Sequence, residues 1–505
     1  MLGLGLGLQY GSVLGPSYDS QAVAHFNRVI ADGGVIPAGL NGLNNLVVAI
    51  KAVYGVTNIT TALNMGLDPE YFGYKLGAGS GTTLGMAAQK LYSICGATGD
   101  ITQTTAASQP LVLPYSSTDG NYFFSSGVTG NYASTPNAAA NRVTGDITLI
   151  VEASMLSWTP SAVETLVAKD NTAVGGRSYA LNIQTNGRPR FNFSLDGTAI
   201  ISVDCTAATG FSAWQKRHVA VERTASTGDV RFYTSVDGIT FTQLGTTVSS
   251  TSGSIFAGNA EVQFGALSTS SLNLVGNIYD SEIYSGLRIS GSGAVLNVDF
   301  DPQDYNPSVS QTTFTSGDTG EVWTINIGSA STGYKSVLVD RTYIQGEGVN
   351  DQLFQTTLNR PNTLTQYVAF NAYANTGGGG GQIIDATNTN YSNSLDPENN
   401  TAVALLMNGA ASARSRTKAI RTLGLATAWN EAGVENGLTI NNGTLTSNAY
   451  TPTPSNTGVR LMARANAAAF ANALLSTYLV SNTRDSSTIR TGMYNTIRGI
   501  NNNAF

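Results

Sequence analysis

Helical periodicity marks the start and the end of the chain. In residues 19–55 apolar side chains recur at intervals of three and four positions: Val23, Phe26, Val29 and Ile30, then Leu40, Leu43, Leu46, Val47, Ile50 and Val53. This spacing puts the apolar groups on one face of each of two helices. A weaker pattern predicts a third helix over residues 86–94. We therefore predict a helical docking domain over residues 17–98 and a C-terminal helix and tail over 485–505.

From residue 108 onward the pattern changes to short segments in which apolar and polar side chains alternate. Apolar groups fall at every second position in several of them: Ile147, Leu149 and Val151; Tyr179, Leu181 and Ile183; Phe191 and Phe193; Val219 and Val221; Tyr367 and Ala369; Val403, Leu405 and Met407. Such alternation is typical of antiparallel sheets with one buried face. Asn186-Gly187, Asp196-Gly197 and Asp237-Gly238 suit tight hairpin turns, because these residues tolerate positive φ.

The alternating region divides into two parts of similar outline, which predicts two β-sandwiches of one type, over residues 108–325 and 335–480. The fold class is therefore predicted to be mainly β, with two sandwiches between helical ends. Gly377–Gly381 are predicted to form a flexible loop in the second sandwich.

Composition points to a surface hydrated by hydroxyl and amide groups. Charged residues make up only 11% of the 505 residues, and 56 residues are Gly. Such a surface is common in extracellular β proteins and in particle proteins, where neighbours cover much of it and charged side chains would be costly to desolvate. The net charge of -6 does not favour nucleic acid or an anionic membrane as a partner. No run of apolar residues is long enough for a membrane span.

The chain begins with an apolar lead, residues 1–16, in which Leu2, Leu4, Leu6 and Leu8 alternate with Gly. It lacks the basic start and the longer apolar run of a secretory signal. We predict that these leucines form an assembly contact with another copy or another protein. Cys95 and Cys205 lie far apart, so neither a disulfide framework nor a cysteine metal site is implied.

Many short segments over residues 108–325 resemble, in order, the laminin-G/concanavalin-A-like modules of phage minor structural proteins. The matching segments are Gln109–Leu111, Asn121-Tyr122, Gly127–Pro136, Gly145–Ile147, Trp158–Pro160, Leu166–Lys169, Ser178-Tyr179, Trp214, Phe232–Gly238, Phe300–Pro302, Phe314–Ser316 and Thr319–Thr324. The resemblance covers somewhat under half of the chain. It implies a laminin-G-like jelly-roll sandwich in a bacteriophage virion, in a tail, fibre, collar or head appendage. The implied partners are other virion proteins and copies of the chain itself.

No residue pattern argues for catalysis. His25 and His218 lack a second histidine at metal-ligand spacing and are interpreted as structural. Carboxylate pairs such as Asp299 with Asp301, or Glu347 with Asp351, are interpreted as strand-end and turn residues, although glycan hydrolysis does use two carboxylates. We therefore predict that the protein is not an enzyme.

No cofactor is predicted. Calcium occurs in some laminin-G relatives, and Asp196, Asp237 or Asp351 could supply oxygens for it. Aspartate before glycine is more simply explained by turn chemistry.

Three aromatic residues, Trp158, Tyr122 and Tyr132, are candidates for stacking on sugar rings, with core or interface positions as the alternative. The leading functional hypothesis is a virion structural protein that acts through assembly contacts, with attachment to a host glycan as an added role. The alternatives are a separate glycan-binding lectin or adhesin and, third, a glycoside hydrolase.

Overall fold

The structure, a computed structural model, describes most of the chain up to residue 374 and separate segments beyond it. The described residues are 17–77, 86–171, 175–267, 271–328, 333–359, 363–374, 384–385, 394–399, 402–407, 410–417, 423–431, 435–444, 446–448, 457–462 and 472–505. The predicted assembly contacts Leu2, Leu4, Leu6 and Leu8 and the predicted loop Gly377–Gly381 lie outside these residues.

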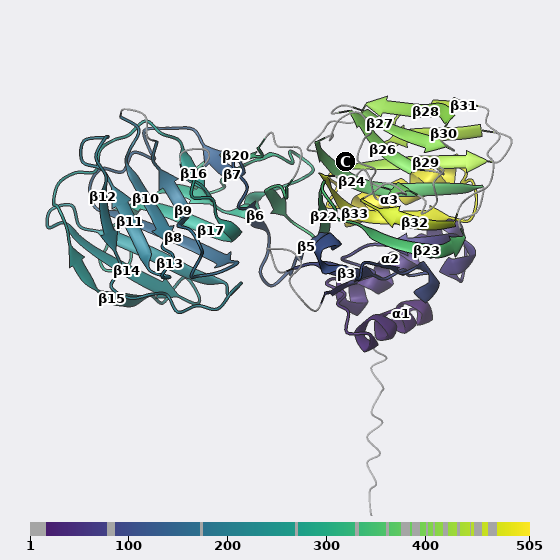
Figure 1. The fold of residues 1–505 in the computed structure, drawn as a ribbon, viewed down its shortest axis with the longest axis horizontal. Helices are drawn as coiled ribbons and strands as arrows, with labels where there is room; N and C mark the ends of the chain where they lie inside the picture. The colour runs from purple at the N-terminus through teal and green to yellow at the C-terminus, as the bar shows by residue number, and fades with distance from the viewer. Residues whose placement is uncertain are drawn as a thin grey trace, which may run out of the picture.

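Two antiparallel sheets form one lobe of the molecule, here called the first sandwich (Figure 1). The β8 sheet runs in the order β15 (Thr242–Ser249), β14 (Asp229–Ser235), β13 (Arg217–Arg223), β8 (Ile147–Met155), β17 (Val275–Ser285), β6 (Tyr122–Ser126) and β21 (Val337–Val339), with β18 (Val295–Phe300) beside β17. The β9 sheet runs in the order β12 (Ile201–Asp204), β11 (Pro189–Phe193), β10 (Tyr179–Ile183), β9 (Glu164–Lys169), β16 (Val262–Phe264), β7 (Tyr132–Thr135), β20 (Val322–Asn326) and β19 (Thr313–Thr315).

The alternating residues of these strands meet in one apolar core between the two sheets. Leu149 and Val151 of β8 are fully buried, as are Leu181 of β10 and Phe264 of β16. Burying such side chains is the main stabilising contribution to a sandwich. The predicted hairpins are present, and Gly238 has the positive φ of 69° that its turn requires.

A second pair of sheets forms the other lobe, here called the second sandwich (Figure 1). The β24 sheet runs in the order β31 (Thr446–Asn448), β30 (Glu435–Ile440), β29 (Gly424–Glu431), β24 (Leu364–Ala374), β33 (Asn472–Ser481), β22 (Tyr343–Glu347) and β5 (Leu111–Leu113), with β1 (Leu63–Leu67) beside β33. The β23 sheet runs in the order β2 (Tyr74–Leu76), β3 (Ala88–Leu91), β4 (Ile101–Thr102), β23 (Leu353–Asn359), β32 (Thr457–Leu461), β25 (Ile384–Asp385), β26 (Ser394–Asn399), β27 (Ala402–Met407) and β28 (Ala410–Thr417).

The first sandwich is inserted into the second. β1 to β5 precede the insertion in sequence, and three of them pair with strands that follow it: β1 with β33, β4 with β23 and β5 with β22. The chain crosses to the first sandwich through residues 114–121 and returns through 340–342. This strand pairing differs from the predicted boundaries of the two sandwiches, 108–325 and 335–480. β5 belongs to the second sandwich and β21 to the first. Both strands have only three residues, and their apolar pattern does not specify which sheet they join.

Three helices cover the outer face of the β24 sheet. They are α1 (Ser20–Ala31), α2 (Gly39–Tyr54) and α3 (Ser487–Ile500), the predicted C-terminal helix. Their apolar faces share one core cluster with Tyr367 and Ala369 of β24. Val368 and Phe370, the alternate residues of β24, face the interior of the second sandwich, so this strand is buried on both sides.

The helical prediction was correct for α1, α2 and α3 and wrong for residues 86–94. That stretch contains β3, whose Lys90 and Leu91 pair with Thr102 and Ile101. Residues 17–98 therefore contain two helices and three strands of the second sandwich, not helices alone. The prediction of a mainly β fold with two sandwiches is confirmed. Among the described helices, none combines the length and the hydropathy that crossing a bilayer requires.

Candidate functional site

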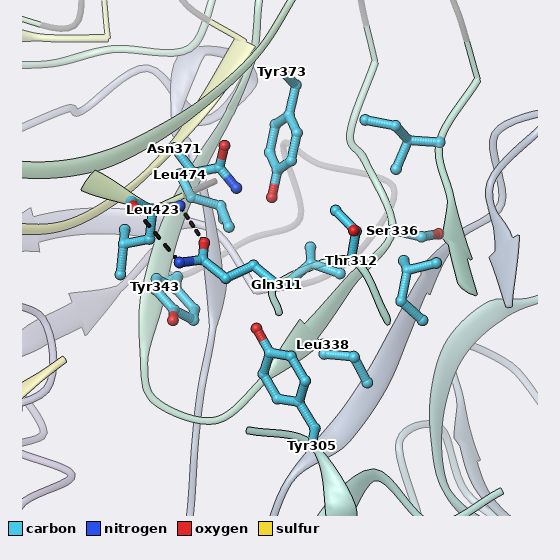
Figure 2. A pocket seen from close by; sticks show the side chains of 13 residues that line it. Tyr305, Gln311, Thr312, Ser336, Leu338, Tyr343, Asn371, Tyr373, Leu423 and Leu474 are labelled. Carbon is cyan, nitrogen blue, oxygen red and sulfur yellow. Dashed lines mark hydrogen bonds between the residues drawn. The ribbon is translucent and has the colours of Figure 1, made fainter. Parts of the chain in front are cut away.

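The two sandwiches meet at an apolar junction that encloses a small cavity, shown in Figure 2. Gln311 of the first sandwich reaches across it: its Nε2 donates to Ala504 O at 2.6 Å, and its Oε1 accepts from the backbone N of Leu423. The cavity has a volume of only about 40 Å³. This is room for about one water molecule and too little for a sugar ring.

An open groove lies next to this cavity, and Tyr305 lines both. Its volume is about 570 Å³, which is within the usual range of small-molecule sites. Its walls come from both sandwiches, the two connecting segments and the C-terminal tail: Glu70, Tyr71, Tyr115, Asn121, Gln303, Asp304, Tyr305, Asn306, Pro307, Asp340, Arg341, Ile500 and Asn502. We call this set the junction groove.

A buried ion pair forms the base of the junction groove. Arg341 Nη2 lies 2.9 Å from Asp68 Oδ1 and 3.0 Å from Oδ2, and Nη1 donates to Ile500 O at 2.6 Å. Thr477 of β33 donates its hydroxyl to Asp68 Oδ2. Burial disfavours the guanidinium charge, but Asp68 and Glu70 together hold the pKa of Arg341 above its usual value. The return segment is thereby fixed to the second sandwich and to α3.

Two carboxylates beside Arg341 are held by the chain's own hydrogen bonds. Glu70 Oε2 accepts from the backbone N of Thr342, and Asp340 accepts from the hydroxyl of Tyr343 and the amide of Asn502. Burial raises the pKa of Glu70 and that of Asp340. These contacts fix the carboxylates in place before any ligand arrives.

The rim of the junction groove carries amide groups and phenol rings. Asn121 and Gln303 are joined by two hydrogen bonds, from Asn121 N to Gln303 Oε1 and from Gln303 Nε2 to Asn121 O. Tyr71 and Tyr115 are half-buried, and the guanidinium carbon of Arg341 lies 5.7 Å from the centre of the Tyr71 ring. Exposed ring faces, amides and carboxylates together can bind a ligand with many hydroxyl groups and apolar C–H faces.

The three aromatic residues predicted to contact glycans lie elsewhere. Trp158 is 1% exposed, and its Nε1 donates to Gln215 O. Tyr122 is 2% exposed, and its hydroxyl donates to Pro114 O. Neither can stack on a sugar at the surface, so the alternative of a core or interface position holds for both. Tyr132 on β7 is half-buried and outside the groove.

The two histidines occupy structural positions. His25 on α1 lies with its Nε2 2.8 Å from Phe72 O, and burial lowers its pKa to about 4. His218 on β13 lies with its Nδ1 3.8 Å from Glu152. Within the described ranges, no three His, Cys, Asp or Glu side chains are grouped as a metal site would need.

The aspartates considered for calcium or catalysis make local hydrogen bonds. Asp196 and Asp237 each accept two backbone N–H groups of their own turn, and Asp301 accepts from Gln303 N. Asp351 is buried and accepts from the hydroxyl of Tyr334. Burial, reinforced by Glu347, raises the pKa of Asp351 to about 8. Turn chemistry accounts for the first three, as interpreted from the sequence.

Sequence reasoning missed every residue of the junction groove. A usable signal was present, because Asp68 and Glu70, and likewise Asp340 and Arg341, put charges next to apolar strands in a chain that is only 11% charged. Such charges are costly to bury unless they are paired. Asp68 and Arg341 form such a pair although they are 273 positions apart. Neither segment alone indicates this pairing.

No protein-family model and no curated protein sequence matches the chain. Solved structures with some similarity include the LG1-3 region of the laminin alpha2 chain, at 12% identity and a TM-score of 0.28 over 73% of this chain and 63% of that one. Domains LG4-5 of the mouse laminin alpha1 chain align at 12% identity and a TM-score of 0.25, over 73% and 86%. A Ruminococcus gnavus sialidase CBM40 bound to alpha2,3 sialyllactose aligns at 13% and 0.26, over 33% and 91%.

Proposed function

We propose that the protein binds glycans in the junction groove and does so without catalysis. The observation that carries this proposal is the composition of the groove: an open volume of about 570 Å³ in which half-buried tyrosines stand beside fixed amides and carboxylates. Carboxylate and amide groups accept and donate the paired hydrogen bonds that vicinal sugar hydroxyls make, and phenol rings cover their C–H faces.

The hydrogen bonds of the groove carboxylates are the reason for proposing binding and not hydrolysis. A hydrolase needs one carboxyl group to donate a proton and another to act as base or nucleophile. Here Glu70, Asp304 and Asp340 each accept a hydrogen bond from the chain itself, through Thr342 N, Gly317 N and Tyr343 Oη respectively. These hydrogen bonds hold the three carboxylates in fixed positions in the wall of the groove.

The surface of a bacteriophage particle is the location we propose for this binder, as the sequence resemblance implies. Attachment of a particle to its host needs a glycan contact that is rigid relative to the rest of the protein. The groove is framed by two sandwiches, two connecting segments and α3, which supply that rigidity. Mass spectrometry of purified particles tests the location separately from the binding.

The experiment is retention of the full chain on immobilised bacterial surface polysaccharides, comparing Tyr115→Ala with Tyr132→Ala. Both variants remove a half-buried tyrosine, but only Tyr115 lines the groove. Loss of one sugar-stacking ring should weaken binding by about 1 to 2 kcal/mol, or roughly tenfold. Tyr132→Ala should bind as the unmodified protein does.

Three outcomes would overturn parts of this proposal. If no polysaccharide retains the protein, glycan binding is wrong. If Tyr132→Ala loses binding and Tyr115→Ala keeps it, the groove is the wrong site and the sequence-predicted tyrosine is the right one. If new reducing ends accumulate during incubation, the absence of catalysis is wrong.

A further inference from the structure

A second hollow in the first sandwich shares no lining residue with the junction groove. Its volume is about 440 Å³. It is lined by Phe211, Arg217, Thr234, Ser235, Val236, Asp237, Thr240 and Thr242. We call this set the rim pocket.

The rim pocket lies where the inward positions of β14 and β15 change from apolar to polar side chains, beside Val219 of β13, which is still fully buried in the core. On β13 and β14 the partners Val221 and Phe232 are both fully buried in the core. Two residues further along, Val219 pairs with Thr234, and Thr234 pairs with Thr242 of β15. Paired residues share a face of the sheet, so polar side chains occupy the inward positions where the core would otherwise continue.

Arg217 occupies the next inward position of β13, and its charge has no carboxylate partner in the part of the chain that the structure describes. Its Nη1 donates to Lys216 O at 2.7 Å, and its guanidinium carbon lies 5.9 Å from the centre of the Phe211 ring. The cations nearby are paired, Lys216 with Glu152 and Arg231 with Asp229. A guanidinium with free donors in a pocket is suited to a planar, bidentate anion such as a carboxylate.

Asp237 supplies an acceptor in the same pocket. Its Oδ1 takes the hydroxyl of Ser235 and the backbone N–H groups of Ile239 and Thr240, and these bonds fix the turn. Its Oδ2 receives no hydrogen bond from a described residue and is open to a ligand. The hydroxyls of Thr234, Thr240 and Thr242 add donors and acceptors around it.

We propose that the rim pocket binds a sugar that carries a carboxylate, that is, a uronic acid residue. Arg217 receives the carboxylate, while Asp237 and the threonine hydroxyls receive the ring hydroxyls. Phe211 and Val236, which is 72% exposed, cover the apolar face of the ring. The site shares no residue with the junction groove, so the two proposals stand independently.

The test is calorimetric titration of the full chain with a trimer of galacturonic acid and with the methyl ester of the same trimer. The ester keeps every ring hydroxyl and replaces each carboxylate by an uncharged group that is larger by one methyl. A bidentate charge-assisted contact contributes about 1.5 to 3 kcal/mol, so the acid should bind roughly 10- to 100-fold more tightly than the ester. This comparison uses the unmodified protein and does not depend on a variant folding.

Variants then locate the site. Arg217→Gln should remove the preference for the acid, whereas Arg231→Gln, on the neighbouring strand and outside the pocket, should keep it. Tyr115→Ala in the junction groove should also keep it. The proposal is overturned if acid and ester bind equally, if neither binds, or if a folded Arg217→Gln protein keeps the preference. A preference lost in Tyr115→Ala would move the acid site to the junction groove.

Discussion

Arg341 and Asp68 form an ion pair in the interior of the protein, with side chains that are 2% and 0% exposed. The pair joins the segment that returns from the first sandwich to the segment that follows β1. Asp68 also accepts from the backbone N atoms of Glu70 and Tyr71. Removing only its charge would leave the buried guanidinium of Arg341 without a counter-ion, while an amide oxygen at this position could still accept from the two N–H groups.

We therefore predict that Asp68→Asn lowers the free energy of unfolding by about 3 to 5 kcal/mol, as expected when one member of a buried pair is removed. Chemical denaturation measures this. The control is Asp204→Asn, which breaks the more exposed pair with Arg190 and should cost less than about 1 kcal/mol. Equal costs for the two variants would show that the Arg341 pair is no more important than a surface pair.

Glu222 is predicted to anchor the loop that follows β17. This carboxylate is fully buried and accepts from Ile289 N, Ser290 N, the Ser290 hydroxyl and the Tyr233 hydroxyl. Glu222→Ala leaves these donors without a partner, at a cost of at least about 2 kcal/mol. Limited proteolysis should then cut within residues 287–294. Glu282→Ala, which removes a carboxylate whose hydrogen bond among the described residues is to Tyr284, should leave the loop protected.

Asp280 is predicted to make the protein less stable as the pH rises. Burial, with Glu282 and other carboxylates nearby, raises its pKa from 3.8 to about 8. Between these two values the folded state holds a proton that the unfolded state has released, so stability falls from pH 4 to pH 8. Asp280→Asn should be more stable than the unmodified protein at pH 8, by on the order of 2 kcal/mol, and nearly equal to it at pH 4.

Thermal denaturation at both pH values measures this difference. Asp318→Asn, at an exposed carboxylate of the same lobe, is the matched control substitution. A constant difference between Asp280→Asn and the unmodified protein across this pH range would contradict the raised pKa.

His25 is predicted to make the protein less stable as the pH falls. Burial lowers its pKa from 6.5 to about 4, so the unfolded state takes up a proton in this range before the folded state does. The stability that His25 contributes is complete above pH 6.5 and is lost as the pH falls toward 4, by about 3 kcal/mol. His25→Gln should lose less stability over the same range. If both proteins respond identically to acid, His25 is not the group responsible.

The sequence was sufficient to predict the elements in which apolar residues recur at a regular interval over many positions. α2 and β8 were predicted from their apolar spacing alone, because in each of them the apolar residues at that spacing are buried in a core along the whole element. It was insufficient for Leu111–Leu113 and Val337–Val339, since three apolar residues pair equally well with either sandwich. It was misleading for residues 86–94, where tertiary pairing with β4 prevails over a weak helical period.

The candidate site was harder to predict than the fold for a physical reason. The junction groove is assembled from segments near residues 70, 115, 303, 341 and 502, and each is an ordinary turn or connection by itself. Trp158 and Tyr122 attracted attention because they are aromatic, yet large aromatic side chains contribute most to a core when they are buried. These two side chains are buried by the packing of core clusters, and the neighbouring residues in the sequence do not reveal that packing.

The insertion of the first sandwich into the second also has a consequence for biosynthesis. β1 pairs with β33, so Leu63 cannot pair with Ser481 until about 400 more residues have been synthesised. At usual translation speeds this is on the order of 20 to 80 s. Meanwhile the first sandwich, whose strands all lie between residues 122 and 339, can close on its own. Nascent chains stalled at residue 380 should therefore hold a protease-resistant inner lobe and unprotected strands on its N-terminal side.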